Sequence, residues 1–230
     1  MKFFSIAIST YEMQGKGMDF LNFSLSMLMK QTFKDFEVII SDNSKNDSIK
    51  ILCEKWKDYI NIKYFKNDIN KLDNPSANIN NAINNCTGKY IKILFLDDFI
   101  NTEIGLEKLH NLLINNDCMW LINACNHTYD GHNLHSKHNP YWNNDMHLGN
   151  NSLGSPSVLC IKNENVELFD EQLSWLMDCD YYKKYYIKYG EPLIINEDIV
   201  SIRISSNQLT SLLADERKNS EYSILIDRYK

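Results

Sequence analysis

The first hundred residues alternate between short apolar runs and amphipathic stretches. The apolar runs predict four strands, at 3–8, 35–42, 60–65 and 90–96. The stretches between them repeat apolar residues every three or four positions and predict helices, at 18–31, 49–58 and 76–85. Gly88 is expected to close the last helix in a left-handed conformation. This alternation is typical of an α/β fold with a mostly parallel, Rossmann-like sheet and helices on both faces.

The second half of the chain has a different pattern of polar and apolar residues. A helix at 103–116 and a strand at 119–125 precede segment 126–151, which is polar, holds five of the six histidines and is expected to be a long loop. Beyond it the pattern predicts a helix that Gly190 caps, a C-terminal amphipathic helix, and strands at 153–161, 193–195 and 199–204. No repeat or flexible linker interrupts the chain, so a single domain over 1–230 is expected.

The histidines of segment 126–151 raise the alternative of a zinc site. Their spacings do not repeat a metal-ligand pattern, and no pair of cysteines supports them, so a solvated loop is preferred. The six cysteines of the chain are scattered, without a C-x-x-C pair. No secretion signal precedes them, which indicates reduced thiols and a cytoplasmic protein.

Charge and hydropathy disfavour two classes of protein. The chain has 24 basic and 30 acidic residues and a net charge of −6, which argues against a broad electrostatic grip on nucleic acid. No apolar run approaches the roughly 20 residues of a membrane-spanning helix. A phosphate-bearing ligand would have to be held by backbone donors, a few basic side chains or a metal ion.

Two adjacent acids end the most apolar of the predicted strands. The run from Ile93 to Leu96 has the length of a buried strand, and Asp97 and Asp98 follow it directly. The first two strands also end on polar or acidic residues, and the carboxyl ends of parallel strands share the edge where open α/β sheets bind ligands. Paired carboxylates suit Mg²⁺ or Mn²⁺, which in turn suit phosphate oxygens. An ordinary acidic turn is the alternative.

Gly15 and Gly17 form a Gly-x-Gly after the first strand, as in dinucleotide-binding loops. The sixth position of that motif is Phe20 instead of glycine, and no Gly-Lys-Ser/Thr follows. Neither a dinucleotide fingerprint nor a P-loop is therefore complete. The segment is predicted to be a flexible connection between strand and helix, and a Rossmann dehydrogenase is disfavoured.

Two further acids, Asp178 and Asp180, lie at the start of the tyrosine- and lysine-rich helix of the second half. Aspartate is favoured in the first turn of a helix, where it caps backbone N–H groups and complements the helix dipole. Helix capping is therefore one interpretation of this pair. A catalytic role is the other.

These segments, in this order and over essentially the whole chain, resemble the family 2 glycosyltransferases of the GT-A fold. The most specific similarity is the helix, Gln-Thr-aromatic turn and second strand at 25–44. Other stretches resemble the family's opening strand, metal-binding acidic motif, acceptor-side region and closing Arg and Gln-x-Ser/Thr motif, at 4–11, 77–98, 153–180 and 203–210. The chain departs from the family pattern at Ser9, Glu12, Asn43, Met177 and Ser205.

The resemblance implies roles for these residues. Residues 1–100 would form the nucleotide-sugar-binding half, and 101–230 the acceptor-binding half with the C-terminal helix. The nucleotide sugar, with a UDP-sugar favoured, would contact the strand ends at Thr10, Tyr11, Glu12, Asp42, Asn78 and Asp97. Asp98 would bind Mn²⁺ or Mg²⁺ at the diphosphate. Asp178 would be the general base of a single displacement with inversion, and Asp180 is the second choice.

The implied function is transfer of a sugar to a hydroxyl of a glycan or a lipid-linked saccharide, as in polysaccharide biosynthesis. The partners are then a nucleotide sugar and a saccharide acceptor, with no nucleic acid, and a lipid-linked acceptor would bring peripheral membrane contact. Trp142, Trp175 and Tyr181 are candidates for stacking on sugars, with burial in the core as the alternative.

Two other functions remain open from the sequence. A nucleotidyltransferase shares the nucleotide-binding sheet and the metal, but its product would be accompanied by pyrophosphate. A non-catalytic nucleotide-sugar-binding protein of the same fold would bind a donor without transferring its sugar. The altered residues at family motif positions keep the second alternative in view.

Overall fold

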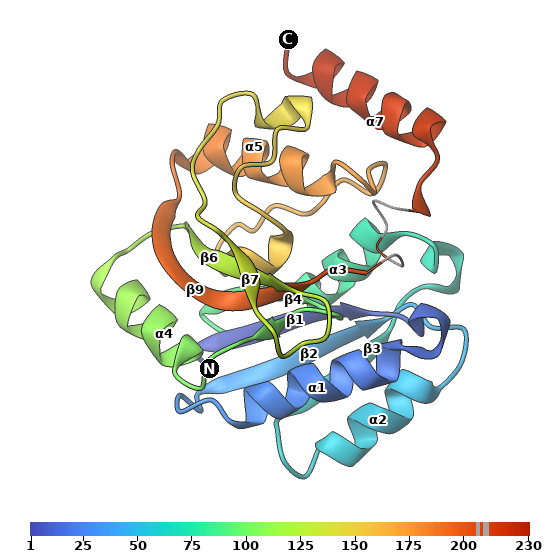
Figure 1. Cartoon of the computed structure of the whole chain (residues 1–230), viewed down its shortest axis with the longest axis vertical. Coiled ribbons are helices and arrows are strands. Elements are labelled where there is room, and N and C mark those ends of the chain that lie inside the picture. The colour runs from blue at the N-terminus through green and yellow to red at the C-terminus, as the bar shows by residue number, and fades with distance from the viewer. Residues whose placement is uncertain (206–207, 209–211) are drawn as a thin grey trace.

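A mixed β-sheet runs through the middle of the molecule in Figure 1. The structure, a computed structural model, describes residues 1–205, 208 and 212–230. Within these residues the strand order is β3-β2-β1-β4-β8-β6-β9-β5, and β7 pairs with β6 beside this path. One sheet therefore receives strands from both predicted halves of the chain.

The first half contributes four parallel strands, β1 (Phe4–Thr10), β2 (Phe36–Asp42), β3 (Ile62–Lys66) and β4 (Tyr90–Phe95). β1 lies between β2 and β4, and β3 lies outside β2. The apolar side chains of β1, β2 and β4 are buried almost throughout because helices cover both faces of the strands. Their carboxyl ends meet at one edge, where Thr10 is in register with Asp42 and Ser9 with Phe95.

The second half contributes the mixed part of the sheet. Its strands are β5 (Phe99–Ile100), β6 (Trp120–Thr128), β7 (His135–His138), β8 (Leu159–Lys162) and β9 (Leu193–Arg203). β8 is antiparallel to both β4 and β6, whereas β6 and β9 run parallel. The α/β fold predicted from the sequence is confirmed, with its parallel strands concentrated in the first half.

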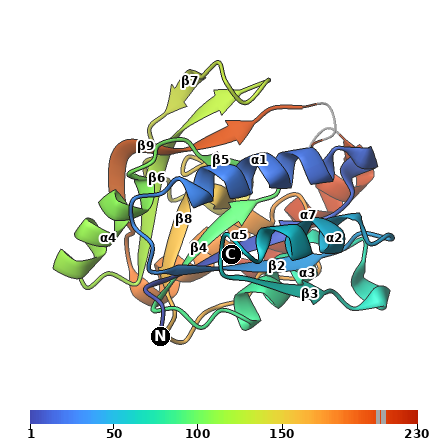
Figure 2. The same cartoon turned by 90° about the horizontal axis from the view of Figure 1, so that it is seen from below.

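Helices cover the sheet on both faces. They are α1 (Gly17–Met29), α2 (Ser48–Trp56), α3 (Pro75–Asn84), α4 (Gly105–Asn115), α5 (Met177–Tyr189) and α7 (Asp215–Arg228). In Figure 1, α1 and α2 lie below the parallel strands, and α5 and α7 lie above them. Figure 2 views the same layers from the side of α1 and α2. In the described part of the chain, no helix is long and apolar enough to cross a bilayer.

The second half differs from its predicted elements in three places. Segment 126–151 is not loop throughout, because β6 continues to Thr128 and pairs antiparallel with β7. The strands predicted at 193–195 and 199–204 are one strand, β9, whose register against β6 shifts near Ala124. The strand predicted at 153–161 begins only at Leu159, after a 3-10 turn at Pro156–Val158.

Gly88 does not cap a helix, which corrects the prediction. α3 ends at Asn84, and Gly88 is absent from the glycines with positive φ. A Cβ atom at this position would lie 2.7 Å from the backbone carbon of Phe4 and 2.7 Å from the backbone nitrogen of Ser5. The glycine is required because β1 passes very close to the turn that precedes β4. Gly190, by contrast, ends α5 with φ +79°, as predicted.

Candidate functional site

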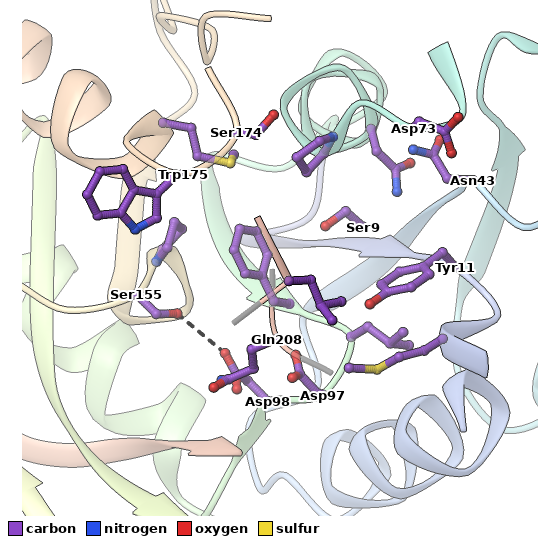
Figure 3. Close-up of a pocket in the computed structure, with 18 of the residues that line it drawn as sticks. Ser9, Tyr11, Asn43, Asp73, Asp97, Asp98, Ser155, Ser174, Trp175 and Gln208 are labelled. Atoms are coloured by element: carbon purple, nitrogen blue, oxygen red, sulfur yellow. Dashed lines mark hydrogen bonds between the residues drawn. The ribbon is translucent and has the colours of Figure 1, made fainter. Parts of the chain in front are cut away.

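A cavity of about 520 Å³ opens at the carboxyl ends of β1 and β4. In Figure 3, Tyr11 and Asp73 lie on one side of it, Trp175 lies on the other, and Asp97 and Asp98 lie between them. This is the position at which open α/β sheets bind ligands. The first turn of α5 and the segment before β8 complete its wall, so both halves of the chain contribute.

Most of the site residues predicted from the sequence meet in this cavity. Six of the nine line it: Tyr11, Glu12, Asn78, Asp97, Asp98 and Asp178. The other three are fully buried outside its lining: Thr10, Asp42 and Asp180. The contacts of each group explain this division.

Thr10 and Asp42 support the cavity from beneath. The Thr10 hydroxyl lies 3.4 Å from Asp42 Oδ1, in accordance with their register in the sheet. The Asp42 carboxylate also accepts hydrogen bonds from the Ser44 backbone N–H (2.8 Å) and the Tyr64 hydroxyl (2.7 Å), and pairs with Lys66 at 3.3 Å. These contacts fix the loop after β2, so the two residues shape the site without reaching its open space.

The polar end of the cavity lies beside β1 and α3. Tyr11 is 41% exposed and offers a flat ring face to a ligand. Glu12 accepts a hydrogen bond from the Lys45 backbone N–H (3.1 Å), which ties the loops after β1 and β2 together. Asn78, on α3, donates to the Thr10 carbonyl (2.9 Å). This end therefore combines an aromatic face with anchored polar groups, which suits a nucleoside.

The adjacent acids after β4 differ in their surroundings. Asp98 is buried: its Oδ2 accepts from the hydroxyls of Ser157 (2.5 Å) and Ser155 (3.4 Å), and its Oδ1 from the Arg203 backbone N–H (3.0 Å). Asp97 is half-buried, and among the described residues no side chain donates to its carboxylate. Asp97 thus offers the more accessible oxygens and Asp98 the more rigidly held ones.

Burial raises the pKa of both acids. The pKa of Asp97 rises to about 6, although the nearby Arg203 opposes the shift. The pKa of Asp98 is raised well above its usual range by burial and by the charge of Asp97. A divalent cation at the pair would favour the ionised forms and reverse both shifts. The pair is therefore suited to receive a cation.

Negative charge dominates the lining. The described residues contribute five carboxyl groups and one lysine: Glu12, Asp73, Asp97, Asp98, Asp178 and Lys45. Among these same described residues, no group of three or more His, Cys, Asp and Glu side chains could hold a metal by itself. A divalent ion at Asp97 and Asp98 would need further oxygens from its ligand, which is how Mg²⁺ is commonly held together with phosphates.

Asp178 lies in the first turn of α5, on the cavity side. Its Oδ1 accepts from the Cys179 backbone N–H (2.7 Å) and its Oδ2 from the Asn151 side-chain amide (2.6 Å). Burial raises the pKa of this carboxyl to about 6 in spite of these hydrogen bonds. A carboxylate with a pKa near the working pH is well placed to accept a proton.

Asp180 points away from the cavity, toward α7. Its Oδ1 accepts from Arg228 (2.6 Å) and from the Tyr229 hydroxyl (2.8 Å), and its Oδ2 pairs with Lys184 at 2.6 Å. Successive residues of an α-helix are rotated by about 100°, so residues two positions apart differ by about 200°. Asp178 and Asp180 therefore face opposite sides of α5. The structure thus brings only one of the two candidate bases to the cavity.

The remaining sequence candidates are divided between the site and the core. Trp175 lines the cavity, whereas Tyr181 stacks on Phe169 with ring centroids 4.0 Å apart. Trp142 likewise stacks on Tyr186, at 4.0 Å. These two rings belong to the packing around α5.

The closing motif is described only in part. Gln208 lines the cavity and donates to the Arg203 carbonyl (2.7 Å). The Arg203 guanidinium lies 4.6 Å above the ring of Phe20 and donates through Nε to the Asp97 carbonyl (3.2 Å). Asn207 and Thr210 lie outside the described residues.

Sequence reasoning did not single out Lys45, Asp73 or Ser157, which line or support the site. Lys45 and Asp73 come from polar loops, where no periodic pattern distinguishes a ligand contact from a solvated turn. One signal was available for Asp73: it lies just before Asn74, whose side chain caps α3 at the ligand edge of the sheet.

The α/β sheet and the acid-lined cavity at its strand ends have the arrangement expected of a GT-A protein. The chain belongs to glycosyl transferase family 2, whose family model matches residues 5–161. That match includes the strand ends and the acid pair after β4. Asp178 lies beyond it, so its assignment depends on the geometry described above.

Solved structures support the fold. S. aureus TarS in complex with UDP superposes with a TM-score of 0.70 at 19% identity, over 100% of this chain and 72% of that one. The Pyrobaculum calidifontis mannosyltransferase PcManGT, in complex with GDP-Man and Mn²⁺, superposes with a TM-score of 0.68 at 11% identity, over 100% of this chain and 65% of that one. Similarity at these identities establishes the GT-A fold and no shared substrate.

Relatives found by sequence match a shorter stretch. A Campylobacter jejuni GalNAc(5)-diNAcBac-PP-undecaprenol beta-1,3-glucosyltransferase is 37% identical over 76 residues, 33% of this chain and 24% of that protein. An uncharacterized glycosyltransferase of Rickettsia conorii is 35% identical over 85 residues, 36% of this chain and 14% of that protein. The matches thus span a quarter or less of the relatives' own lengths.

Proposed function

We propose that the protein is a glycosyltransferase that moves a sugar from a nucleotide-sugar donor to a hydroxyl of a saccharide acceptor, with metal assistance and inversion. The observation that carries this proposal is the order of groups along one cavity. In Figure 3, Tyr11 lies on one side of the cavity, Asp97 lies between, and Trp175 lies on the other side. Asp178, whose pKa is about 6, lies in the first turn of α5, directly after the segment of Trp175. A bound donor would lie across these groups in the same order.

The donor end is assigned to residues 1–100 and the acceptor end to 101–230. Tyr11, Glu12 and Asn78 would contact the nucleoside, with Thr10 and Asp42 holding their loops in place. A UDP-sugar is the favoured donor, and the UDP bound by TarS supports that choice by analogy of fold. With the nucleoside bound at one end of the cavity, the sugar of the donor would lie near Asp178.

A divalent ion, Mn²⁺ or Mg²⁺, fits the acid pair. The lining holds five carboxyl groups against one lysine, so a diphosphate would meet net repulsion without added positive charge. Asp97 would be the more accessible ligand, and Asp98, the residue favoured from the sequence, would support it through its own hydrogen bonds. When bound, the ion would supply charge stabilisation for the departing diphosphate.

Asp178 acts as the general base of this proposal. It accepts the proton of the acceptor hydroxyl while the new glycosidic C–O bond forms, and the bond from the anomeric carbon to the diphosphate oxygen breaks on the opposite side. A single displacement of this kind inverts the anomeric carbon. Asp180 is left out of the mechanism because its charge is already paired with Arg228 and Lys184.

The acceptor and the cellular setting are proposed from a relative and from the cysteines. The Campylobacter relative is named for a lipid-linked saccharide, which favours an acceptor of that class and peripheral membrane contact during polysaccharide biosynthesis. All six cysteines are free thiols, which fits the reducing environment of the cytoplasm. Trp175 is placed to stack on an acceptor sugar.

The test is thermal unfolding with UDP-glucose, UDP-N-acetylglucosamine or GDP-mannose, each with and without Mn²⁺. A donor present at about 100 times its Kd should raise Tm by roughly 5 to 10 °C, because it binds only the folded state. The shift should require Mn²⁺ and be lost in Asp97→Asn. The exposed Asp58→Asn is the matched control and should behave as wild type.

Product analysis separates the alternatives. Release of UDP from a bound donor supports glycosyl transfer, with water as acceptor when no saccharide is supplied. Release of pyrophosphate from a nucleoside triphosphate would instead indicate a nucleotidyltransferase. Tight, Mn²⁺-dependent donor binding without turnover toward any saccharide acceptor would leave a non-catalytic nucleotide-sugar-binding protein.

A further inference from the structure

Asn151 makes hydrogen bonds with both ends of its side-chain amide. Its Nδ2 donates to Asp178 Oδ2 at 2.6 Å and to the Gly154 carbonyl at 3.0 Å. Its Oδ1 accepts from the backbone N–H groups of Leu153 (3.1 Å) and Gly154 (2.9 Å). One side chain therefore organises a turn and touches the carboxylate that faces the cavity.

We infer that Asn151 is a positioning residue for Asp178: its amide holds the carboxylate oriented toward the cavity through a hydrogen bond from outside α5. The inference rests on the proposed role of Asp178 as the base. The family model matches residues 5–161, so Asn151 lies inside the matched stretch and Asp178 lies outside it. Nothing in the sequence pattern links the two positions, and only the fold brings them together.

The turn that carries Asn151 is itself held firmly. Gly154, with φ +104°, accepts a second hydrogen bond on its carbonyl from the Tyr182 hydroxyl (3.0 Å). Ser152 bonds back to Tyr141 through its hydroxyl (2.5 Å), and its carbonyl accepts from His138 Nε2 (2.9 Å). Because the turn is anchored, the Asn151 amide cannot move with the Asp178 side chain and therefore holds that carboxylate in one orientation.

The same short segment also holds the other acid. Ser155 and Ser157, four and six residues after Asn151, donate to Asp98. The fully buried Lys92, on β4, donates to the Ser157 carbonyl. Residues 151–157 thus contact one carboxylate on each side of the cavity and set the distance between them.

No cation faces Asp178 among the described residues. Its neighbours on α5 are the Cys179 N–H and thiol and the neutral Tyr182, and the segment 151–157 contributes the Asn151 amide. The acids across the cavity, Asp97 and Asp98, supply no positive charge. The Asn151 amide is therefore the one donor to this carboxylate from outside α5 in the described chain, and its loss has no substitute there.

The decisive variant is Asn151→Asp, which has nearly the same shape. The new carboxylate keeps the oxygen that accepts from the Leu153 and Gly154 N–H groups, and the Gly154 carbonyl keeps its hydrogen bond from Tyr182 but loses the one from Asn151. The substitution replaces the donor that faces Asp178 with an acceptor. Two carboxylates in contact share a proton, so the pair should ionise at higher pH, by more than about one unit. Asn143→Asp is the matched control: Asn143 makes a similar turn with the Asp145 N–H and does not touch Asp178.

Two measurements decide the matter. Carbon-13 NMR of labelled aspartate, with Asp178 assigned by its loss in Asp178→Asn, follows its ionisation without requiring turnover. The pH profile of UDP release from UDP-N-acetylglucosamine with Mn²⁺ follows its use, and its acid limb should move upward in Asn151→Asp with the KM for the donor unchanged. Asn143→Asp should match wild type in both.

The outcomes are distinguishable. An unchanged titration of Asp178 in Asn151→Asp overturns the positioning role, whatever the activity. A shifted titration with an unmoved pH profile means that Asn151 contacts a carboxylate that is not the base, which also overturns it. A wild-type protein that binds donors but never turns them over removes the proposed function itself.

Discussion

The aspartates of the site differ in how far the protein already compensates their charge. Asp180 is paired with the cations Arg228 and Lys184, whereas Asp98 and Asp178 accept hydrogen bonds on both oxygens from neutral groups. Asp97 and Asp178 face the cavity with raised pKa values of about 6. A carboxylate that is not yet paired has the most to gain from a cation or a proton, so the chemistry is expected at these two.

Replacing the proposed base, Asp178, gives a prediction at the same scale. Asp178→Asn should lower UDP release from a donor by roughly 10² to 10⁴-fold, because the proton acceptor is lost while donor contacts remain. The wild-type rate should rise as pH increases through about 6, since only the ionised form of Asp178 accepts a proton. Steady-state kinetics at several pH values measure both effects.

The control for this variant is Asp145→Asn, an exposed acid of the preceding segment. It should keep the rate and the pH profile of wild type. Equal rates for Asp178→Asn and wild type would remove Asp178 from the role of base.

The sequence predicted which residues lie near strand and helix ends, but only in part which way their side chains point. The acids after β4 were found because a buried strand ends there. Thr10 and Asp42 lie equally close to strand ends, but their side chains turn toward each other below the surface. For Asp178 and Asp180, helical geometry alone excludes a shared face, while the choice between them required the position of α7.

Among the elements, β2 is tied to its surroundings by the buried Glu37. Its Oε1 accepts from the Ser5 hydroxyl on β1 (2.7 Å) and the Thr87 backbone N–H before β4 (2.9 Å), and its Oε2 pairs with Lys63 on β3 at 2.7 Å. Burial alone would raise the pKa of Glu37, but these donors lower it to about 2. One carboxylate thus joins all four parallel strands.

The pH dependence of stability follows from that shift. Because the pKa of Glu37 is about 2 when folded and 4.5 ordinarily, its contribution is present above pH 4.5 and is lost as pH falls toward 2. Glu37→Gln should therefore lower the free energy of unfolding by about 2 kcal/mol at neutral pH. Urea unfolding at a series of pH values should show the difference from wild type shrinking below pH 4.5. A difference independent of pH would contradict this account.

Periodicity predicted long elements well and short ones poorly. The helices and parallel strands of the first half have enough turns or alternations to reveal their period. β5 has two residues and β7 has four, too few to establish alternation, and both form because a neighbouring strand is present. The role of Gly88 was predicted wrongly for a related reason. The close approach of its backbone to β1 depends on residues far away in the sequence, so the local pattern does not reveal it.

At the scale of the whole molecule, α7 holds the segment that leads into α5 on one side of the cavity. The fully buried Glu221 of α7 accepts from the backbone N–H groups of Ser174 (2.9 Å), Trp175 (2.8 Å) and Leu176 (3.0 Å). These N–H groups precede the first turn of α5, which carries Asp178. The last helix of the described chain therefore acts as a cap for the helix of the proposed base.

Removing this cap should loosen the site from a distance. Glu221→Ala leaves buried N–H groups without an acceptor and should cost about 3 kcal/mol, which corresponds to a fall in Tm of roughly 6 to 12 °C. Amide hydrogen exchange at Ser174, Trp175 and Leu176 should accelerate. Glu216→Ala, at an exposed position of the same helix, should change neither quantity. Unchanged, slow exchange of these three amides in Glu221→Ala would show that contacts other than those with Glu221 protect them.

The crowding of carboxyl groups around one cavity has a cost for folding. Asp97, Asp98 and Asp178 all have pKa values above the ordinary range, so each is harder to ionise in the folded chain than in the unfolded one. At neutral pH and without ligands, ionisation of these acids therefore lowers the free energy of unfolding. A cation and a nucleotide would offset this loss, so the ligands of the reaction would also act as partners in folding. A sequence selected for stability alone would not be expected to place these acids together, so their presence fits the ligand-binding role proposed for the cavity.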